Sequence, residues 1–158
     1  MTHYFTEMEM DFLEHFSEGK ILYKMMRFPE YEHIMYADNK HRADMVGLMG
    51  EHAVCEYLGI SPSYSYQMGY DGGVDAVYQG IKLQIKSTGV YGSPMPLDEQ
   101  LNADCYVFVY CDYDQAMAEI IGFIPASCIM ERRVLHSFPR NIRWVIEQKW
   151  LSPINNLK

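Results

Sequence analysis

Four polar residues in the middle of the chain have the types and the spacing needed for metal-assisted hydrolysis of a phosphodiester bond. Asp75 is followed by Gln84 and then by Lys86, and Glu51 precedes all three. Carboxylate and amide oxygens are ligands of the kind that Mg²⁺ and Mn²⁺ prefer. Such an ion lowers the pKa of a bound water and offsets the charge that builds on a phosphoryl oxygen. A lysine beside it can orient or deprotonate the water, or stabilise the transition state.

A β-hairpin over residues 74–86 would bring three of these residues together. Apolar residues alternate with a period of two on both sides of Gln79-Gly80, which predicts strands at 74–78 and 81–86 joined by a two-residue loop. In this register Asp75 lies opposite Gln84, and opposite residues share a face. The polar face then carries Asp75, Val77, Lys82, Gln84 and Lys86. The other face points to a core and carries Ala76, Tyr78, Ile81, Leu83 and Ile85.

The fourth residue, Glu51, lies in the clearest predicted helix, residues 40–58, which Gly59 ends as a C-cap. On a helical wheel Glu51 falls inside the apolar stripe of this helix. A carboxylate in that position costs several kcal/mol unless it is paired, protonated or bound to a cation. Pairing with a nearby Arg or Lys and binding of a cation both stay open. His52 lies about 100° further round the helix, so we expect it to pack or face solvent rather than bind metal.

The remaining pattern predicts an α/β fold in which helices flank a mixed sheet of four or five strands. Two further apolar strands are expected at 105–110 and 119–124, joined by an acidic turn at 112–115. Residues 1–40 read as an accessory helical region, with an apolar stripe through Phe5, Met8, Phe12 and Phe16 and a stop at Gly19. A short helix is expected at 97–103 and a closing helix or strand around 140–150.

The run Asp75, eight residues, then Gln84-Ile85-Lys86-Ser87-Thr88, preceded by Gly50-Glu51-His52-Ala53, resembles the PD-(D/E)XK nuclease superfamily. It is most similar to the Mrr-like and Holliday-junction-resolvase-like branches, where QxK replaces (D/E)xK, and the resemblance covers about residues 42–125. It implies a restriction-endonuclease-like core over residues 41–130. It also implies a Mg²⁺- or Mn²⁺-dependent nuclease of the endonuclease or resolvase type that acts on DNA, whether duplex, branched or single-stranded. A two-fold homodimer is expected by resemblance only.

The resemblance also assigns roles to individual residues. Asp75 is the implied principal metal ligand, Glu51 a supporting metal or water ligand, and Lys86 the catalytic lysine. The amide oxygen of Gln84 and the backbone carbonyl of Ile85 complete the metal shell. Gln84 stands where the family usually has an acid, and Val74 stands where it usually has a proline. Three smaller questions stay open at Asp71, Ser87 and Thr88: Asp71 is a rival for Asp75 in a setting that suits a turn, and the two hydroxyls either contact a phosphate or end the strand.

Composition limits the classes of protein that fit. With 158 residues, 49% of them hydrophobic and 22% charged, one domain over 1–158 is expected, and a disordered chain or a membrane span is excluded. The net charge of −8 argues against a protein that coats DNA by bulk attraction. The charge is uneven, because residues 129–158 hold six bases against two acids. This basic C-terminal segment is either a polyanion contact or a solvated helix surface.

The cysteines and the first residues of the chain indicate the cellular compartment. Four cysteines without a CxxC pair predict reduced thiols and argue against a zinc finger or ribbon. The start of the chain lacks the pattern of a secretory signal, so we expect a cytoplasmic protein without a membrane association.

Two alternatives to an enzyme stay open. Gln84 and the net charge of −8 are compatible with a non-catalytic binding module that keeps the nuclease fold. The acidic surface is compatible with an interaction protein that mimics DNA. Divalent-ion affinity would separate the first alternative from the enzyme, and the arrangement of acids on the surface would test the second.

Overall fold

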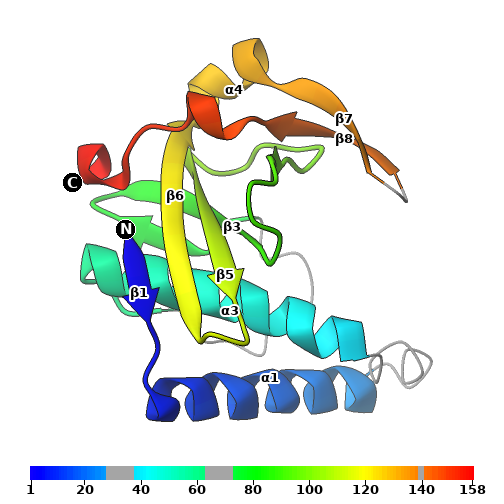
Figure 1. Cartoon of the computed structure of the whole chain (residues 1–158). Coiled ribbons are helices and arrows are strands. Elements are labelled where there is room, and N and C mark those ends of the chain that lie inside the picture. The colour runs from blue at the N-terminus through cyan, green and yellow to red at the C-terminus, as the bar shows by residue number, and fades with distance from the viewer. Residues whose placement is uncertain (28–37, 63–72, 139–140) are drawn as a thin grey trace.

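The computed structural model describes residues 1–27, 38–62, 73–138 and 141–158, and it has an α/β fold with a curled mixed sheet (Figure 1). The sheet has five strands in the order β1-β6-β5-β3-β2. Their bounds are β1 Thr2–Tyr4, β2 Ala76–Tyr78, β3 Ile81–Thr88, β5 Cys105–Asp112 and β6 Met117–Pro125. Strands β3 and β5 are parallel, and the other neighbours in this sheet are antiparallel. The four strands expected from the sequence are therefore confirmed.

The fifth strand, β1, was not expected. Residues 2–4 pair with the edge of β6, with Thr2 opposite Glu119 and Tyr4 opposite Met117. The assignment of the whole of residues 1–40 to a helical region is therefore wrong at its start. Three residues are too few for an alternating pattern to be visible in the sequence.

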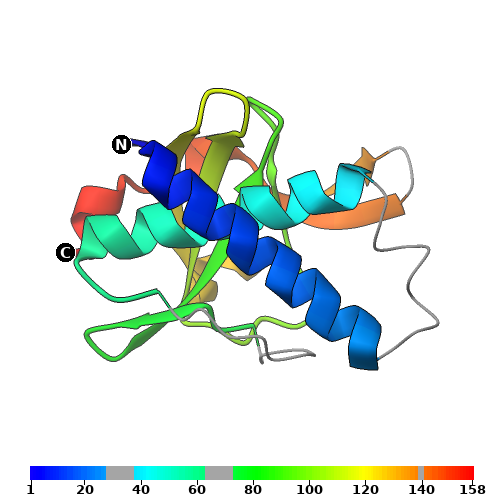
Figure 2. The ribbon, with the colours of Figure 1, turned by 90° about the horizontal axis from the view of Figure 1, so that it is seen from below.

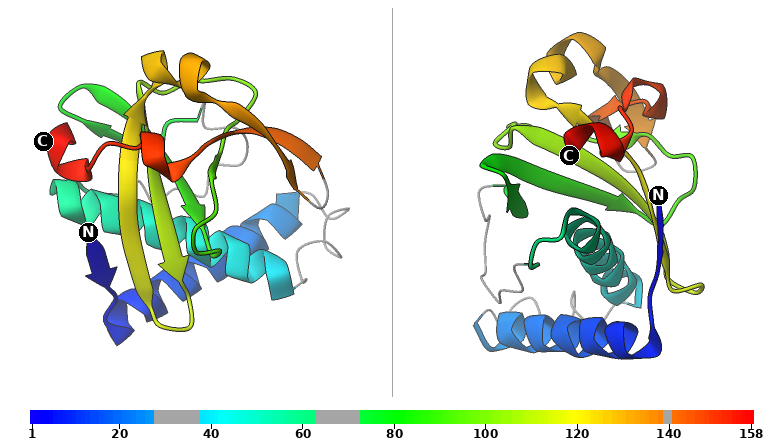
Figure 3. Two further views of the ribbon diagram at one scale, coloured as in Figure 1. Left: turned by 45° about the horizontal axis from the view of Figure 1, so that its top comes forward. Right: turned by 90° about the vertical axis from the view of Figure 1, so that its left-hand side faces the viewer.

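Two long helices lie on one side of the five-stranded sheet. Helix α3 (Asp38–Leu58) packs on the sheet, and helix α1 (Glu7–Arg27) crosses the outer side of α3 (Figures 2 and 3). The predicted stop at Gly19 is wrong, because α1 continues through it. One glycine inside a helix costs only about 1 kcal/mol, so packing on α3 outweighs it. Among the described residues, no helix has the length and apolar character needed to cross a membrane.

The apolar stripe expected along α1 is only partly buried. Phe5 and Phe16 are buried, but Met8 and Phe12 are 81% and 48% exposed. Leu13 is fully buried instead. The buried line on α1 is therefore rotated from the predicted one, because it follows the crossing with α3 rather than the most apolar face of α1.

The C-terminus of α3 agrees with the prediction from Gly59. Gly59 has a φ of 69°, which a residue with a side chain rarely adopts. The amide of Gly59 donates to the carbonyl of Glu56, and the amide of Ile60 donates to the carbonyl of Cys55. These two bonds form a Schellman motif, which satisfies the last carbonyls of the helix.

The strands bury residues on both faces of the sheet, which creates two cores. In β5, Cys105, Val107 and Val109 face α3, whereas Tyr106 and Phe108 face the opposite side. The pairing of β5 with β6 shifts between Phe108 and Val109, so β6 has a bulge. Because the sheet is covered on both faces, its central strands are apolar almost throughout.

The second core lies under a three-stranded antiparallel sheet of order β4-β8-β7 (Figure 1). The elements on this side are β4 Met95–Pro96, α4 Ala126–Arg132, β7 Val134–Phe138, β8 Asn141–Ile146, and the 3-10 turns η2 Gln148–Trp150 and η3 Ile154–Leu157. The short helix expected at 97–103 is wrong. Leu97 instead donates its amide to the carbonyl of Trp144 at 2.9 Å, and this bond draws the segment toward β8. The closing element expected at 140–150 is a strand followed by a 3-10 turn.

The close approach of α3 to β3 predicts opposite effects for two glycines of one helix. A Cβ at Gly50 would lie 3.0 Å from Cβ of Ser87 and still closer to its Oγ, whereas a Cβ at Gly47 would meet nothing within 4 Å. We expect Gly50→Ala to lower the free energy of unfolding by about 1–3 kcal/mol, since α3 and β3 must move apart. Gly47→Ala should raise it by about 0.5–1 kcal/mol through helix propensity. Chemical denaturation measures both, and equal effects of the two variants would contradict the packing described.

Candidate functional site

The β2–β3 hairpin has the register expected from the sequence. Ala76 lies opposite Leu83, Val77 opposite Lys82 and Tyr78 opposite Ile81. The loop residues Gln79 and Gly80 both have positive φ angles, 50° and 84°, which is typical of the two-residue turns that fit twisted strands. Leu83 and Ile85 are buried in the core under α3, as predicted for their face.

Asp75 lies just before β2 and is fixed against β3. Its amide donates to the carbonyl of Leu83 at 2.8 Å. Its Oδ2 accepts a hydrogen bond from the amide of Ile85 at 2.6 Å. The carboxylate is therefore held beside the backbone of the strand that carries Gln84 and Lys86.

Gln84 and Lys86 share one carboxylate partner, Asp98. Oδ2 of Asp98 accepts from Nε2 of Gln84 at 2.9 Å and lies 2.5 Å from Nζ of Lys86. Gln84 is only 6% exposed, and the side chain of Lys86 is 20% exposed. We call these three residues the Asp98 cluster. It brings an acid, an amide and an amine together on one side of β3, a set that can hold a hard cation and donate to a phosphate oxygen.

Glu51 and Asp75 both lie near the thiol of Cys55. Burial, followed by the negative charges of Glu51 and Asp75, raises the pKa of that thiol from 9.0 to about 11. Glu51 is partly buried on α3. Among the residues that the structure describes, the carboxylates of Glu51, Asp75 and Asp98 do not converge to within 4.8 Å of one another. Within the described residues, these three acids therefore do not form a closed cage.

Ser87 and Thr88 have separate local roles. Ser87 points toward α3, where it faces Gly50, and its Oγ is buried without a hydrogen-bond partner among the described residues. It is therefore turned away from the Asp98 cluster. Oγ1 of Thr88 accepts from the amide of Val90 at 3.1 Å and from the hydroxyl of Ser93 at 3.2 Å. Thr88 thus organises the loop that follows β3.

A groove of about 810 Å³ borders Asp98. It runs between the segment after β4 and the β7–β8 sheet, and its lining includes Asp98, Glu99, Leu135, Ile142, Arg143 and Trp144. Leu135 and Ile142 are more than 60% exposed. The groove therefore offers aromatic and apolar surface, a cation and a path to the Asp98 cluster.

Several cations of the basic C-terminal segment lie over aromatic rings. Arg133 lies 4.3 Å from the ring centroid of Trp144, Arg132 5.2 Å from that of Trp150, and Lys158 3.9 Å from that of Tyr57. These positive charges take part in intramolecular cation–π contacts. Arg143 is exposed at the groove.

The sequence did not single out Asp98. Its neighbours Pro94, Pro96 and Leu97 indicated a loop or a short helix, and nothing local marks this acid among others. Asp71, the rival of Asp75, lies outside the described residues. Tyr91, in the loop after β3, is 75% exposed and contacts Tyr110 edge to face.

Comparison of the chain with protein-family models, with curated proteins and with solved structures finds no match.

Proposed function

We propose that this protein is a Mg²⁺- or Mn²⁺-dependent nuclease that hydrolyses phosphodiester bonds in DNA, built on a restriction-endonuclease-like core. The observation that carries the proposal is the bridge that Asp98 makes between Gln84 and Lys86 on the strand next to Asp75. The hairpin motif resembles that of the nuclease superfamily except for the acid at position 84 and the proline at position 74. Asp98 supplies a carboxylate beside position 84. Its negative charge replaces the charge that an acid at position 84 would carry.

The donor set fits a hard divalent cation. Oε1 of Gln84 is buried and has no hydrogen-bond partner among the described residues. A buried amide oxygen without a partner is costly, and a cation would satisfy it. Mg²⁺ is typically held by one or two carboxylates and keeps several waters, so it does not need three converging acids. Asp75, Gln84 and the carbonyl of Ile85 are the proposed ligands, with Glu51 reaching the ion through water.

The ion, when bound, would supply Lewis-acid stabilisation and a more acidic water. Lys86 would orient the attacking water or donate to a non-bridging phosphate oxygen. Its short contact with Asp98 fixes the amine in place, so little reorganisation is needed when the substrate arrives. The amide of Ile85 holds the carboxylate of Asp75 against β3, which limits the positions that the ion can take.

The groove beside Asp98 is the proposed path of the substrate. Trp144 and the apolar side chains of β7 and β8 can contact bases, and Arg143 can contact a phosphate. This arrangement makes the attraction to DNA local, which is compatible with a net charge of −8. The four cysteines are free, which supports the proposed cytoplasmic location, and cleavage of both strands would use the homodimer expected by resemblance.

Cleavage assays on the full chain test the proposal. Duplex, single-stranded and branched DNA are incubated with Mg²⁺, with Mn²⁺ and with EDTA, and the products are resolved by electrophoresis. We expect cleavage of at least one substrate with either metal and none with EDTA. If no substrate is cut under any condition, the fold would serve as a non-catalytic binding module instead.

A further inference from the structure

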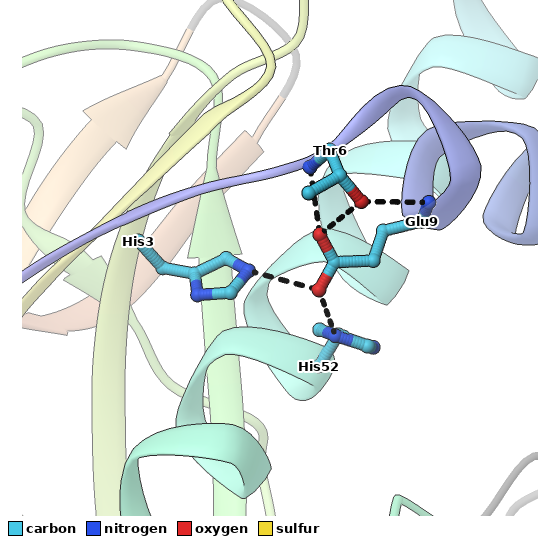
Figure 4. A network of polar contacts seen from close by, with 4 residues as sticks. All are labelled: His3, Thr6, Glu9 and His52. Atoms are coloured by element: carbon cyan, nitrogen blue, oxygen red, sulfur yellow. Dashed lines mark hydrogen bonds and ion pairs between the residues drawn. The ribbon is translucent and has the colours of Figure 1, made fainter.

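Three side chains from distant parts of the sequence converge on the α3 side of the sheet. They are His3 of β1, Glu9 of α1 and His52 of α3, and Figure 4 shows both imidazole rings directed at one carboxylate. Oε1 of Glu9 lies 3.7 Å from Nε2 of His3 and 3.4 Å from Nε2 of His52. The three potential ligand atoms lie within 4.8 Å of one another, and among the described residues no other group of three His, Cys, Asp or Glu side chains converges in this way.

The start of α1 orients Glu9. Oε2 of Glu9 accepts from the amide of Thr6 at 2.6 Å and from its hydroxyl at 2.7 Å. The hydroxyl of Thr6 in turn accepts from the amide of Glu9 at 3.3 Å. This reciprocal pair is a capping box. It fixes one carboxylate oxygen on the helix terminus and leaves the other facing the two imidazoles.

The spacing of the three atoms matches a metal site better than a pair of direct hydrogen bonds. A charge-assisted N–H···O contact has a length of about 2.7–2.9 Å, so both observed separations are too long. Zinc binds imidazole nitrogen at about 2.0–2.1 Å and carboxylate oxygen at about 2.0–2.2 Å. Neighbouring ligands of a tetrahedral ion with those bonds lie about 3.4 Å apart. The two measured separations lie near this value.

The surroundings of the cluster hold the rings in place. His3 contacts Phe5 edge to face with ring centroids 4.5 Å apart, and Phe5 lies 5.6 Å from the ring of His52. Nε2 of His3 is buried and has no hydrogen bond within the described part of the chain. An imidazole nitrogen removed from water in this way needs a ligand to satisfy it. The fixed carboxylate of Glu9 lies beside this nitrogen, so the two groups can bind the same ion.

We propose that His3, Glu9 and His52 bind one zinc-class divalent ion, with water as a fourth ligand. Two imidazoles and one carboxylate suit zinc, whereas the oxygen donors of the hairpin suit Mg²⁺. The ion ties the edge strand β1 and the first turn of α1 to α3. Its role is structural, since none of its ligands belongs to the Asp98 cluster or to the hairpin residues Asp75 and Gln84 that are the proposed Mg²⁺ ligands.

Metal titration of the full chain, freed of metal beforehand, tests this site. Isothermal calorimetry with Zn²⁺ should give about one equivalent of tight binding, and any weaker binding to the oxygen donors of the hairpin should be lost in Asp75→Asn. Co²⁺ in its place should give the visible absorption of a tetrahedral ion without a thiolate charge-transfer band, which excludes binding through Cys128 or another cysteine. Zn²⁺ at about one hundred times its dissociation constant should raise the midpoint of thermal unfolding by roughly 5–10 °C.

Matched variants locate the binding. Glu9→Gln can keep the capping box while removing the charged ligand, and His3→Gln removes one imidazole. Each should weaken Zn²⁺ binding by at least about tenfold to a hundredfold. Glu7→Gln and His15→Gln, exposed residues of the same helix, should leave it unchanged, and so should Asp75→Asn. Absence of saturable Zn²⁺ binding to the unmodified chain would overturn the proposal, as would binding that both Glu9→Gln and His3→Gln retain at full strength.

Discussion

Replacement of Lys86 by methionine should reduce metal-dependent DNA cleavage by about 10²–10⁴-fold while the protein stays folded. Methionine keeps most of the length and apolar volume of the lysine side chain, so it can fill the partly buried position on β3. It removes the amine that lies 2.5 Å from Asp98 and that the proposed mechanism uses to act on water or phosphate. Initial cleavage rates at saturating Mg²⁺ measure the loss, and circular dichroism checks the fold.

Lys82→Met is the matched control. Lys82 lies on the same strand as Lys86, four residues earlier, and on the same predicted face of the hairpin. Its side chain is exposed and is not part of the Asp98 cluster. Its replacement should change the cleavage rate by less than about threefold, mainly through weaker attraction to DNA. Equal losses for Lys82→Met and Lys86→Met would assign the lysines to general electrostatic attraction and remove Lys86 from the catalytic site.

Asp98→Asn should raise the Mg²⁺ concentration needed for half-maximal cleavage by about tenfold to a hundredfold. The carboxylate of Asp98 positions both Gln84 and Lys86 and adds negative charge beside the proposed ligands. Asparagine is nearly the same shape but lacks the charge, so the ion should bind more weakly while the amine remains. High Mg²⁺ should therefore restore most of the rate to Asp98→Asn, whereas it should restore nothing to Lys86→Met.

Glu99→Gln separates this effect from a change of overall charge. Glu99 is the next residue, is exposed, and makes no contact in the Asp98 cluster. Its neutralisation should leave the Mg²⁺ requirement within about twofold of the unmodified protein. A Mg²⁺ requirement that is the same in Asp98→Asn as in the unmodified chain would contradict the role given to Asp98.

The parts of the fold that the sequence predicts are those set by local patterns. The hairpin follows from period-two alternation around Gln79-Gly80, and its observed register agrees at the three pairs from Ala76 to Tyr78, although β2 begins at Ala76 rather than at residue 74. The end of α3 follows from Gly59, because only a residue without a side chain readily takes the left-handed conformation there. The apolar runs at 105–110 and 119–124 predict central strands, and both are found in β5 and β6.

The parts that escaped prediction depend on contacts between distant residues. Strand β1 exists because its three residues complete an edge of β6, and no local signal marks them. The predicted helix at 97–103 is absent because Leu97 pairs with Trp144, far along the chain. The position of Asp98 depends on the same contact, because Asp98 directly follows Leu97. Tertiary pairing overrides local propensity in each case.

The N-terminal region shows the same difference between local and distant information. The capping box spans the four residues from Thr6 to Glu9, so its Thr-x-x-Glu pattern is a local feature of the sequence. The convergence of Glu9 with His3 and His52 depends on how α1 crosses α3, which the apolar stripe of α1 does not define. His52 was expected to pack or face solvent rather than bind metal. Its ring does lie against Phe5, but the proposed zinc site departs from the second half of that expectation.

The pairing of β4 with β8 has a consequence for protein synthesis. Met95 pairs with Ile146 and Pro96 with Val145, so the segment that carries Asp98 is anchored to β8, about fifty residues further along the chain. A ribosome releases the hairpin well before it releases that strand. The nascent polypeptide therefore carries Asp75, Gln84 and Lys86 while their acidic neighbour still lacks its anchor, and the site is assembled only after β8 has emerged.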